Sequence, residues 1–379
     1  MAARLGKDAC FQTRAATECR PYSCAFRFQI ASKMIETDRK TIKCVVWDLD
    51  NTMWDGVLLE DDRVTLRTKV AGIVETLDSR GILQSIASKN DYWMSMDTLK
   101  DLGLSDYFLY PQIGWNSKAA SIQTIARSIN IGLDSIAFLD DQPFEREEVN
   151  FSLPEVLSLD SRDLDGLLEM PEMNPRFVTE DSKLRRSLYL RDQERKQAED
   201  EFIGTKEEFL ASLQMVFTIS SATEEDLKRA EELTVRTNQL NATGYTYSYD
   251  ELSHFCDSAK HKLLTGSLSD KYGSYGTIAL ALVECLEEFW NIKLLLVSCR
   301  VMSRGVGTIL LNHIISEAGK HEVALRAEFV PTARNRMMRL TYQFAGFMQV
   351  EQSGGVIVLE NDLTRVPQFP DYVRIDIHP

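Results

Sequence analysis

The sequence has no apolar run near the roughly 20 residues that a membrane-spanning helix requires. It also has no excess of Lys and Arg: the net charge is −14, which argues against a protein that holds nucleic-acid backbones through clustered basic side chains. Internal repeats and low-complexity tracts are absent too. The expected partners are therefore small molecules and proteins, with no nucleic acid and no membrane.

Cysteine and histidine occur in no pattern typical of a zinc site. The seven Cys include no CxxC pair, and the five His form no metal-spaced cluster. This usage favours a reducing, cytoplasmic location. At 379 residues, with 44% hydrophobic and 26% charged residues, the composition is that of a globular protein long enough for two domains.

Residues 41–175 alternate between short apolar runs and segments with helical spacing. Strands are expected at 43–47, 82–87, 107–109 and 135–139, and helices at 70–80, 91–102 and 117–129. This order predicts an α/β domain, a Rossmann-like parallel sheet flanked by helices. Residues 1–40 are predicted to form an N-terminal extension outside it.

Residues 176–379 follow a charged, proline-containing stretch and predict a second domain of α+β type. Its strands are expected at 215–220, 262–267, 277–282, 292–299 and 323–329, and its helices at 224–237, 303–318 and 333–344.

Two carboxylates, Asp48 and Asp50, come directly after the first predicted strand, in the sequence Asp-Leu-Asp-Asn-Thr. Their separation of two residues places both side chains on the same side of the strand end. One carboxylate can attack phosphorus while the other transfers protons. A hard cation such as Mg²⁺ would compensate their charge. The pair therefore predicts phosphoryl transfer.

Polar residues also follow the other predicted strands, at the sheet edge where ligands bind in open α/β folds. Ser88 and Lys118 can hold a phosphoryl group through a hydroxyl and a point charge. Asp140 and Asp141 end the last strand and can supply metal ligands. A helix cap, a solvated lysine and an acidic loop are the alternatives, but the shared strand order favours a single site.

The loops at this edge are too short to contain a cap domain. Only about fifteen residues separate Thr52 from the helix at Val70. The site should therefore be open, and the second domain or a partner protein is expected to cover it, because small substrates are usually shielded from water during the reaction.

In the second domain, a predicted strand leads through Cys299 into a glycine-containing turn before a helix. Gly305 and Gly307 would let backbone N–H groups approach a phosphate closely, although a purely structural turn is the alternative. Other polar residues are candidates to line an acyl or pantetheine pocket: Arg236, Asn238, Gln239, Arg300, Arg304 and Asn335. For the Arg236–Gln239 group the alternative is helix termination by Asn.

The order DxDxT, Ser-Lys-Asn, Lys118 and Leu-Asp-Asp resembles the four motifs of the haloacid dehalogenase (HAD) superfamily. The later segment resembles the acyl-CoA-binding half of GNAT acyltransferases, with Met302 where that family usually has Gln or Arg. Over most of residues 43–350 the chain is similar to FkbH-like proteins, a HAD-subfamily IIIC domain joined to a GNAT-like domain. The segments that carry this similarity are WDLDNTMWDGVLLED, IASKND, FLDDQPFERE, RTNQLNAT, SCRVMSRGVG and AEFVPTARN.

The resemblance implies a role for each residue of the first site. Asp48 would be the nucleophile and a metal ligand, and Asp50 the acid/base whose backbone carbonyl also binds the metal. The implied phosphate-binding residues are Thr52, Ser88, Asn90 and Lys118. The implied Mg²⁺ site is completed by Asp140 and Asp141.

The resemblance also implies an overall activity. Family members transfer a glyceryl unit from 1,3-bisphosphoglycerate, a phosphorylated three-carbon substrate, to the phosphopantetheine arm of an acyl carrier protein in polyketide and related pathways. Cys299 is the candidate to hold the acyl group, with Arg300 and Arg304 expected to lower its pKa. A buried structural Cys is the alternative. A plain phosphatase, and an acyltransferase with a non-catalytic HAD docking domain, remain competing functions.

A basic segment beside the domain boundary is the candidate docking site for the carrier protein. Within 183–196, an exposed helix is expected to present Arg185, Arg186, Arg191, Arg195 and Lys196. A solvated helix face with internal ion pairs is the alternative.

Overall fold

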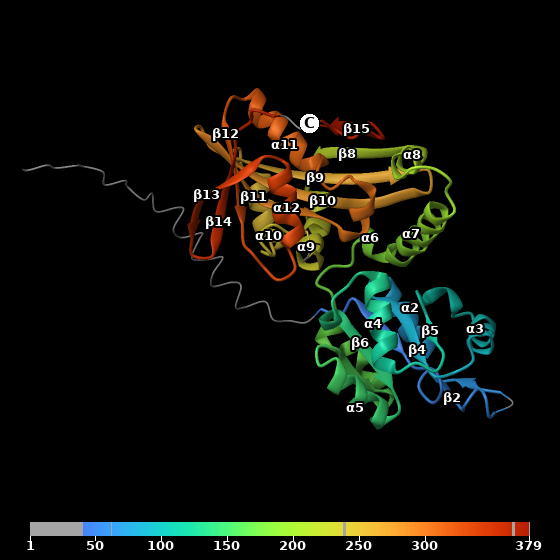
Figure 1. Cartoon of the computed structure of the whole chain (residues 1–379). Helices are drawn as coiled ribbons and strands as arrows, with labels where there is room; N and C mark the ends of the chain where they lie inside the picture. Colours follow the sequence, from blue (N-terminus) through green and yellow to red (C-terminus); the bar gives the residue numbers. More distant parts are fainter. Residues whose placement is uncertain (1–40, 62, 238–239, 366–367, 379) are drawn as a thin grey trace, which may run out of the picture. The chain divides into compact units, whose positions relative to one another are not determined.

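The computed structural model describes residues 41–61, 63–237, 240–365 and 368–378, and residues 39–379 fall in a single unit by their internal contacts. Two sheets organise these residues into two lobes (Figure 1). The expected N-terminal extension, residues 1–40, lies outside the described residues, and the domain boundary at 175 stays a prediction. No helix in the described ranges is long and apolar enough to cross a membrane.

The first lobe contains a five-stranded sheet in the order β5-β4-β1-β6-β7, with every neighbouring pair parallel. Its strands are β1 (Cys44–Trp47), β4 (Leu83–Ser88), β5 (Gln112–Ile113), β6 (Ile136–Asp140) and β7 (Leu157–Asp160). All residues of the three central strands are buried, as expected when helices cover both faces of a parallel sheet. The predicted α/β fold with a parallel sheet is confirmed.

The two faces of this sheet have separate apolar cores, because alternate residues of a strand point in opposite directions. In β1, Val45 and Trp47 belong to one core, and Cys44 and Val46 to the other. The covering helices are α2 (Val70–Ser79), α3 (Tyr92–Asp101), α4 (Lys118–Ile129) and α5 (Pro143–Ser152). The expected Ser117 cap of α4 is present, since its hydroxyl accepts a hydrogen bond from the Ala120 backbone N–H.

Some local predictions in this lobe are wrong. In the segment expected to be extended at 107–109, Tyr107 instead ends a 3₁₀ turn, η1 (Ser105–Tyr107), whereas Phe108 is extended and forms a parallel bridge to Gln84 of β4. The edge strand β5 comes later. The helix α5 and the strand β7 were not expected at all. Between β1 and α2 the chain forms only a small hairpin of β2 (Trp54–Asp55) and β3 (Thr65–Leu66), so this loop contains no cap domain, as predicted.

The second lobe contains an eight-stranded sheet in the order β13-β14-β12-β11-β10-β9-β8-β15. Only the β11–β12 and β8–β15 pairs are parallel among these neighbours. The strands are β8 (Met215–Ser221), β9 (His261–Asp270), β10 (Gly273–Cys285), β11 (Phe289–Val297), β12 (Ala324–Phe329), β13 (Phe347–Ser353), β14 (Val356–Asn361) and β15 (Val373–His378). Its helices are α8 (Lys206–Ser212), α9 (Leu227–Arg236), α10 (Tyr249–Cys256), α11 (Ile309–Lys320) and α12 (Arg336–Phe344).

The helix expected from residue 303 begins later, at Ile309. Residues before it form a 3₁₀ turn, η6 (Cys299–Arg304), which ends at Gly305 with φ of 68°. A side chain is disfavoured at this φ, and a Cβ here would also collide with the Tyr372 hydroxyl. Gly305 is therefore required by the backbone and by close packing at this turn.

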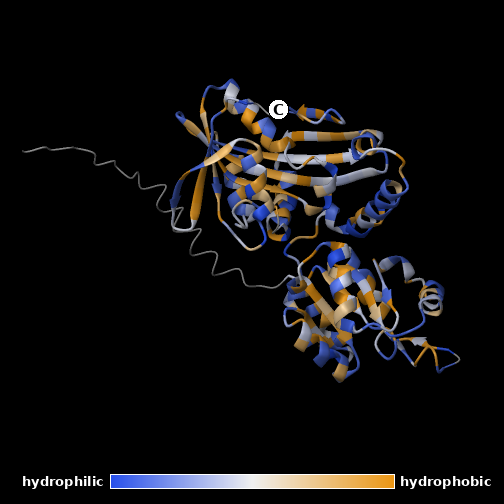
Figure 2. Ribbon diagram, in the orientation of Figure 1, coloured by the Kyte–Doolittle hydropathy of each residue, from blue (hydrophilic) through white to orange (hydrophobic). Residues whose placement is uncertain are grey.

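The connecting helices α6 (Glu180–Lys183) and α7 (Arg185–Asp200) differ from the prediction of an exposed basic face. Although α7 is one of the most hydrophilic helices in Figure 2, Arg185 is 7% exposed and Arg195 is fully buried. Arg186 pairs with Asp78 of the first lobe at 2.9 Å. The basic side chains are used in internal ion pairs, which removes Arg185, Arg186 and Arg195 from the expected docking patch.

Arg195 holds α7 to the second lobe through a buried network. Its guanidinium donates to both carboxylate oxygens of Asp270, at 2.8 and 2.9 Å, and lies 3.8 Å from the centroid of the Tyr275 ring. The Tyr275 hydroxyl donates to the same carboxylate at 2.9 Å. An ion pair buried in this way is strongly destabilising to break, because one charge is left without its partner.

We therefore expect Asp270→Asn to lower the free energy of unfolding by roughly 3–5 kcal/mol. The matched control is Asp376→Asn, which breaks the exposed Arg374–Asp376 pair and should cost no more than about 1 kcal/mol. Urea unfolding followed by circular dichroism measures both. Equal destabilisation by the two substitutions would contradict a special role for the Arg195 network.

Candidate functional site

Three central strands of the first sheet end in polar residues at the same edge. Asp48 directly follows β1, Ser88 is the last residue of β4, and Asp140 is the last residue of β6. Because β4, β1 and β6 are adjacent and parallel, these residues lie next to one another at the carboxyl edge. The Asp48 backbone N–H donates to the Leu139 carbonyl at 2.9 Å, which extends the pairing of β1 with β6 to the site itself.

Lys118 lies at the centre of this edge and is 3% exposed. Its ammonium group donates to Asp48 Oδ1, lies 3.0 Å from Asp140 Oδ2 and donates to the Ala87 carbonyl at 2.9 Å. Burial by itself lowers the pKa of Lys118, but the carboxylates of Asp48 and Asp140 outweigh it and raise the pKa overall. Lys118 is therefore a fixed cation against the proposed nucleophile.

Asp48, Asp140 and Asp141 form the acidic cluster, in which one carboxylate oxygen from each residue lies within 4.8 Å of the others. Burial, followed by the charge of Asp48, raises the pKa of Asp140 to about 6 and also raises the pKa of Asp141. Asp141 Oδ1 is buried and has no hydrogen-bond partner among the described residues. Three carboxylates facing one lysine leave an excess of negative charge, and oxygen donors of this kind fit a hard divalent cation such as Mg²⁺.

Asp50 is held apart from the acidic cluster. Its Oδ1 accepts hydrogen bonds from the Trp54 indole at 2.8 Å and from the Leu58 backbone at 3.1 Å, and its Oδ2 accepts from Asn90 Nδ2 at 2.9 Å. Burial raises the pKa of Asp50, while the bonds from Trp54 and Leu58 act in the opposite direction. Its metal contact through the backbone carbonyl stays a prediction.

The expected phosphate-binding residues have clear structural partners. Asn90 is 1% exposed, and besides its bond to Asp50 its Oδ1 accepts from the Asp91 N–H at 2.9 Å. Thr52 Oγ1 accepts from the Asp141 N–H at 3.0 Å and so orients the acidic turn. Ser88 is buried at the end of β4. Direct contact of these residues with phosphate stays a prediction.

Glu145 belongs to the site but was not expected there. It lies in the first turn of α5, is 6% exposed, accepts from Lys89 at 2.7 Å and lies 3.8 Å from Lys118. The sequence feature that could have indicated Glu145 is an acidic residue shortly after Asp140-Asp141, at the start of a helix. That helix, α5, was not predicted. Glu145 steadies the two lysines beside the acidic cluster.

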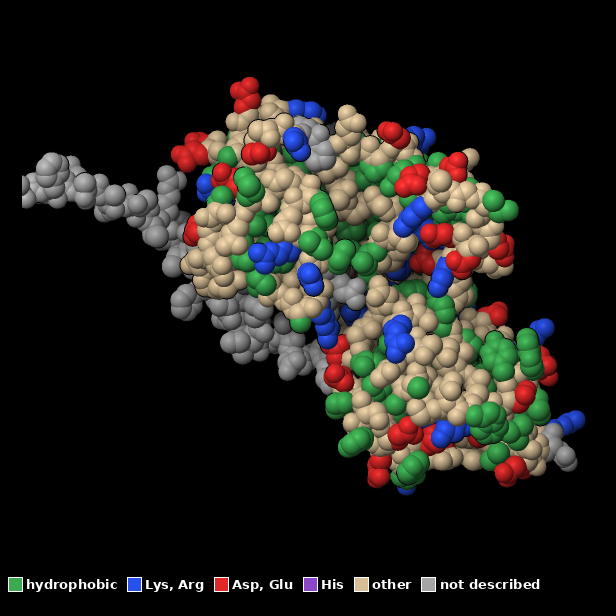
Figure 3. Space-filling model, viewed as in Figure 1, with side chains coloured by type: hydrophobic (Ala, Val, Ile, Leu, Met, Phe, Trp, Pro, Cys, Tyr) green, Lys and Arg blue, Asp and Glu red, His purple; other side chains and the backbone are tan. Residues whose placement is uncertain are grey.

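Exposed apolar side chains come from the loops and helices that follow the strand ends. They gather on the first lobe near α3 and the β2–β3 hairpin (Figure 3). The exposed apolar residues that follow the strand ends are called the apolar rim below: Leu59, Tyr92, Trp93, Met94, Trp115 and Phe144. Exposed apolar groups beside a polar site are typical of a surface that receives a partner or a substrate.

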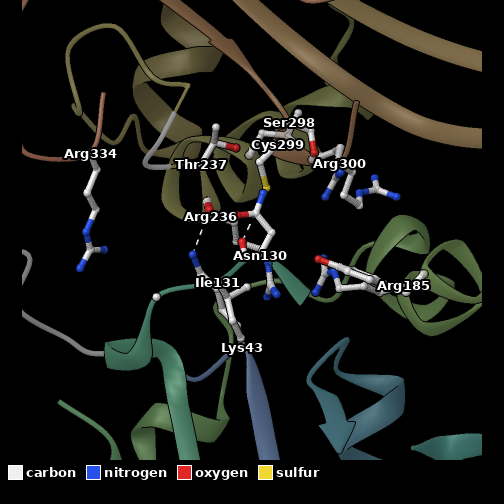
Figure 4. Close-up of a pocket in the computed structure, with 14 residues that line it drawn as sticks. Lys43, Asn130, Ile131, Arg185, Arg236, Thr237, Ser298, Cys299, Arg300 and Arg334 are labelled. Atoms are coloured by element: carbon white, nitrogen blue, oxygen red, sulfur yellow. Dashed lines mark hydrogen bonds between the residues drawn. The ribbon is translucent and has the colours of Figure 1, made fainter. Parts of the chain in front are cut away.

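Cys299 lies in a different cavity, of about 240 Å³, lined by residues of both lobes and of α7 (Figure 4). Arg236 and Arg300, two of the predicted pocket residues, line it together with Lys43 of the first lobe. The Cys299 thiol is half-buried and lies 3.9 Å from the Asn130 carbonyl oxygen.

The predicted activation of the Cys299 thiol requires correction. Burial raises its pKa, and the opposing charges of Arg300 and Lys43 do not reverse the shift. Arg304 does not face this cavity: it is 4% exposed and pairs with Glu199 at 2.9 Å. A buried thiol is disfavoured as thiolate unless nearby positive charge compensates in full.

Other predicted pocket residues lie elsewhere. Asn335 is 1% exposed, and its amide donates to the carbonyls of Asn241, Ala242 and Val330, so it joins two loops rather than lining the cavity. Gly305 packs on Tyr372, and neither it nor Gly307 lines the cavity. The remaining two predicted residues, Asn238 and Gln239, lie outside the described residues.

The acidic cluster and the Cys299 cavity lie at opposite edges of the first sheet. Lys43 precedes β1 and Asp48 follows it, a separation of roughly 16 Å at about 3.3 Å per strand residue. The second lobe contacts the amino edge, where Lys43 donates to the Arg236 carbonyl at 2.9 Å and Arg334 pairs with Asp134 at 3.0 Å. The expectation that the second domain covers the phosphoryl site is therefore wrong for the described residues.

Comparisons with known proteins found partial similarities. No family model and no curated protein matches the chain. Among solved structures, it is similar to the N-terminal part of a Bacteroides fragilis protein that contains a phosphatase domain complexed with Mg, with 29% identity over 41% of this chain and TM-score 0.33. The match spans 45% of that chain, under half of its length.

Two acetyltransferase structures are also similar to part of the chain. The ribosomal-protein-S18-alanine N-acetyltransferase of Escherichia coli matches with 20% identity over 40% of this chain and 97% of its own, at TM-score 0.31. The PaiA N-acetyltransferase of Thermoplasma acidophilum, in complex with coenzyme A, matches with 13% identity over 38% of this chain and 98% of its own, at TM-score 0.32.

The raised pKa of Cys299 predicts slow alkylation near neutral pH. The thiolate fraction falls as the pKa rises, so iodoacetamide should modify Cys299 more slowly at pH 7 than it does in the urea-unfolded chain, where thiols have a pKa of about 8.5. The rate of Cys299 alkylation should keep rising as the pH is raised above about 8.5. Peptide mapping by mass spectrometry measures it, and a rate plateau below about pH 8 would contradict this.

Proposed function

We propose that the chain is a magnesium-dependent phosphoryl-cleaving enzyme with Asp48 as nucleophile. The observation that supports it is the contact of one buried lysine, Lys118, with Asp48 and Asp140 at the carboxyl edge of a parallel sheet. A lysine in this position neutralises charge that develops on a transferring phosphoryl group. Asp48, Asp140 and Asp141 would hold Mg²⁺, which supplies charge compensation for the incoming phosphate when bound.

The residues of the site divide the chemistry between them. Asp48 Oδ attacks phosphorus, the P–O bond to the leaving group breaks, and the electron pair leaves with that oxygen. Asp50, positioned by Trp54 and Asn90, transfers a proton to the leaving oxygen and later takes one from the water that hydrolyses the aspartyl phosphate. Fixing Asp50 with three hydrogen bonds holds its carboxylate in one place for both steps.

We further propose, from the resemblance to FkbH-like proteins, that the enzyme transfers a glyceryl or related acyl unit from 1,3-bisphosphoglycerate to an acyl carrier protein. The Cys299 sulfur would attack the acyl carbon, the C–O bond to the 1-phosphate would break, and that phosphate would leave with the electron pair. The thioester on Cys299 would still carry the 3-phosphate, which the Asp48 site would remove in a later step. The carrier's phosphopantetheine thiol would then replace Cys299 at the acyl carbon.

The positions of the two sites constrain this proposal. Because they lie at opposite edges of the first sheet, thioester formation at Cys299 and phosphate-ester cleavage at Asp48 must be separate binding events. The apolar rim supports a partner at the Asp48 edge, since the described part of the second lobe leaves that edge uncovered. An acyl carrier protein that presents its pantetheine-bound substrate there would also shield the reaction from water.

A plain phosphatase is the second candidate function. It is favoured by the raised pKa of the Cys299 thiol, because a weakly acidic thiol is a poor nucleophile at neutral pH. Intact-protein mass spectrometry after incubation with 1,3-bisphosphoglycerate and Mg²⁺ separates the two candidates. A phosphoglyceryl-sized or glyceryl-sized mass gain supports acyl transfer, and phosphate release with no mass gain supports the phosphatase.

Asp48→Asn should lower the rate of Mg²⁺-dependent phosphate release from acetyl phosphate at least about 10³-fold, because the attacking oxygen loses its charge. The measurement is inorganic phosphate released by the folded variant, with folding checked by circular dichroism. Asp163→Asn changes an exposed carboxylate of the same lobe and should leave the rate unchanged. Near wild-type release by Asp48→Asn would falsify the nucleophile assignment.

Cys299→Ala should keep phosphate release but lose the acyl adduct, because the two chemistries lie at opposite sheet edges. Peptide mapping after incubation with 1,3-bisphosphoglycerate and Mg²⁺ locates the adduct. The matched control is Cys256→Ala, which should retain it. An adduct on Cys256 or Cys285, or one that survives in Cys299→Ala, would show that another residue carries the acyl group.

A further inference from the structure

The Cys299 cavity has an unbalanced charge. Six of its lining residues are cationic, whereas no carboxylate of the described residues lines it. These six are Lys43, Arg185, Arg229, Arg236, Arg300 and Arg334. A concentration of positive charge on a small concave surface favours an anionic ligand, because low-dielectric walls focus the field into the cavity.

Three of the six cations have carboxylate partners behind the cavity wall. Arg185 pairs with Glu232, Arg229 lies 2.8 Å from both Glu232 and Asp181, and Arg334 pairs with Asp134 at 3.0 Å. These ion pairs fix the wall and neutralise half of its positive charge. They leave the other three cations to face the cavity.

Lys43, Arg236 and Arg300 have no ion-pair partner within the described part of the chain. Lys43 is 8% exposed, and among the described residues its ammonium group donates to one acceptor, the Arg236 backbone carbonyl, at 2.9 Å. Arg300 donates through Nη2 to the Tyr275 carbonyl at 2.8 Å, while its Nη1 is buried and has no hydrogen-bond partner among the described residues. A buried guanidinium nitrogen without an acceptor is costly, so a ligand oxygen would stabilise it.

We propose that Lys43, Arg236 and Arg300 form a binding site for a small phosphate-bearing anion beside the Cys299 thiol. A phosphate monoester carries a charge of about −1.5 to −2 and three acceptor oxygens, which match the cations left without partners. Arginine forks bind phosphate oxygens in pairs, and lysine adds a point charge. The volume of about 240 Å³ suits a ligand of few heavy atoms, since it lies below the roughly 300–1,000 Å³ of pockets for drug-sized molecules.

The electrostatics of Lys43 support the same site. Burial, together with the charge of Arg236, lowers the pKa of Lys43 to about 8. The charges of Cys299 and Asp134 act in the opposite direction but do not restore the usual pKa, and an anion in the cavity would favour the charged form further. Lys43 comes from the first lobe while Arg236 and Arg300 come from the second, so a bound anion would also bridge the two lobes.

This phosphate site is separate from the one proposed at Asp48. It lies at the amino edge of the first sheet and contains no residue of the acidic cluster. Binding here does not depend on phosphoryl cleavage, so the Asp48→Asn variant provides a background in which the two proposals can fail independently.

Protection of Cys299 from iodoacetamide tests the site in the full-length protein. Inorganic phosphate and 3-phosphoglycerate are compared with sodium chloride at matched ionic strength, and Cys299 modification is followed by peptide mapping. A ligand present at ten times its Kd should slow alkylation about tenfold, because only the unliganded fraction reacts. Protection should be the same in wild type and in Asp48→Asn. Equal alkylation rates of wild-type Cys299 in phosphate and in chloride would by themselves overturn the proposal.

Charge-removing variants test which residues hold the anion. Lys43→Met and Arg300→Met should each raise the phosphate concentration needed for half-protection by about tenfold or more, the loss of one charge-assisted contact. Arg326→Gln removes a positive charge from the second lobe at the half-buried Glu360 pair, away from the cavity, and should leave that concentration unchanged. Undiminished protection in folded Lys43→Met and Arg300→Met, or an equal loss in Arg326→Gln, would show that phosphate does not bind through these residues.

Discussion

The first lobe depends on one buried interaction, that of Lys118 with the carboxylates of Asp48 and Asp140. These groups can be buried together only because strand pairing brings the ends of β1 and β6 side by side and the cap at Ser117 sets the start of α4. A shift of one residue in either strand would turn a carboxylate away from the lysine. The supporting contacts follow from this arrangement: Thr52 holds the acidic turn, Asn90 holds Asp50, and Glu145 holds Lys89.

The second lobe is placed by a different kind of contact. At the amino edge of the first sheet, Arg185 of α7 donates to the Gly81 carbonyl, and Lys43 of the first lobe donates to the Arg236 carbonyl of the second. A charge that bonds to a carbonyl is only partly compensated, and this leaves positive charge around Cys299. The same contacts that join the lobes therefore create the cationic cavity around Cys299.

The connecting helix shows why charge patterning misled the interpretation of this region. In sequence, α7 has the composition of a solvated helix, and nothing local distinguishes Arg195 from Arg191. In the structure Arg195 is fully buried, because Asp270, some 75 residues later, provides a carboxylate at the β9–β10 turn. A buried arginine requires such a partner, and its position depends on the fold of the second sheet.

The sequence by itself determined the parallel sheet, the position of Asp48, Asp50, Lys118 and the Asp140 pair at strand ends, and the absence of a cap domain in the loop after β1. These follow from local patterns, since hydrophobic period and the carboxyl-edge rule need no long-range information. Only the tertiary structure decided that Glu145 joins the site, that Asn335 and Arg304 are structural, and that Cys299 faces Lys43 instead of Asp48. Each of these depends on contacts between residues that are far apart in the sequence, and short-range patterns do not record such contacts.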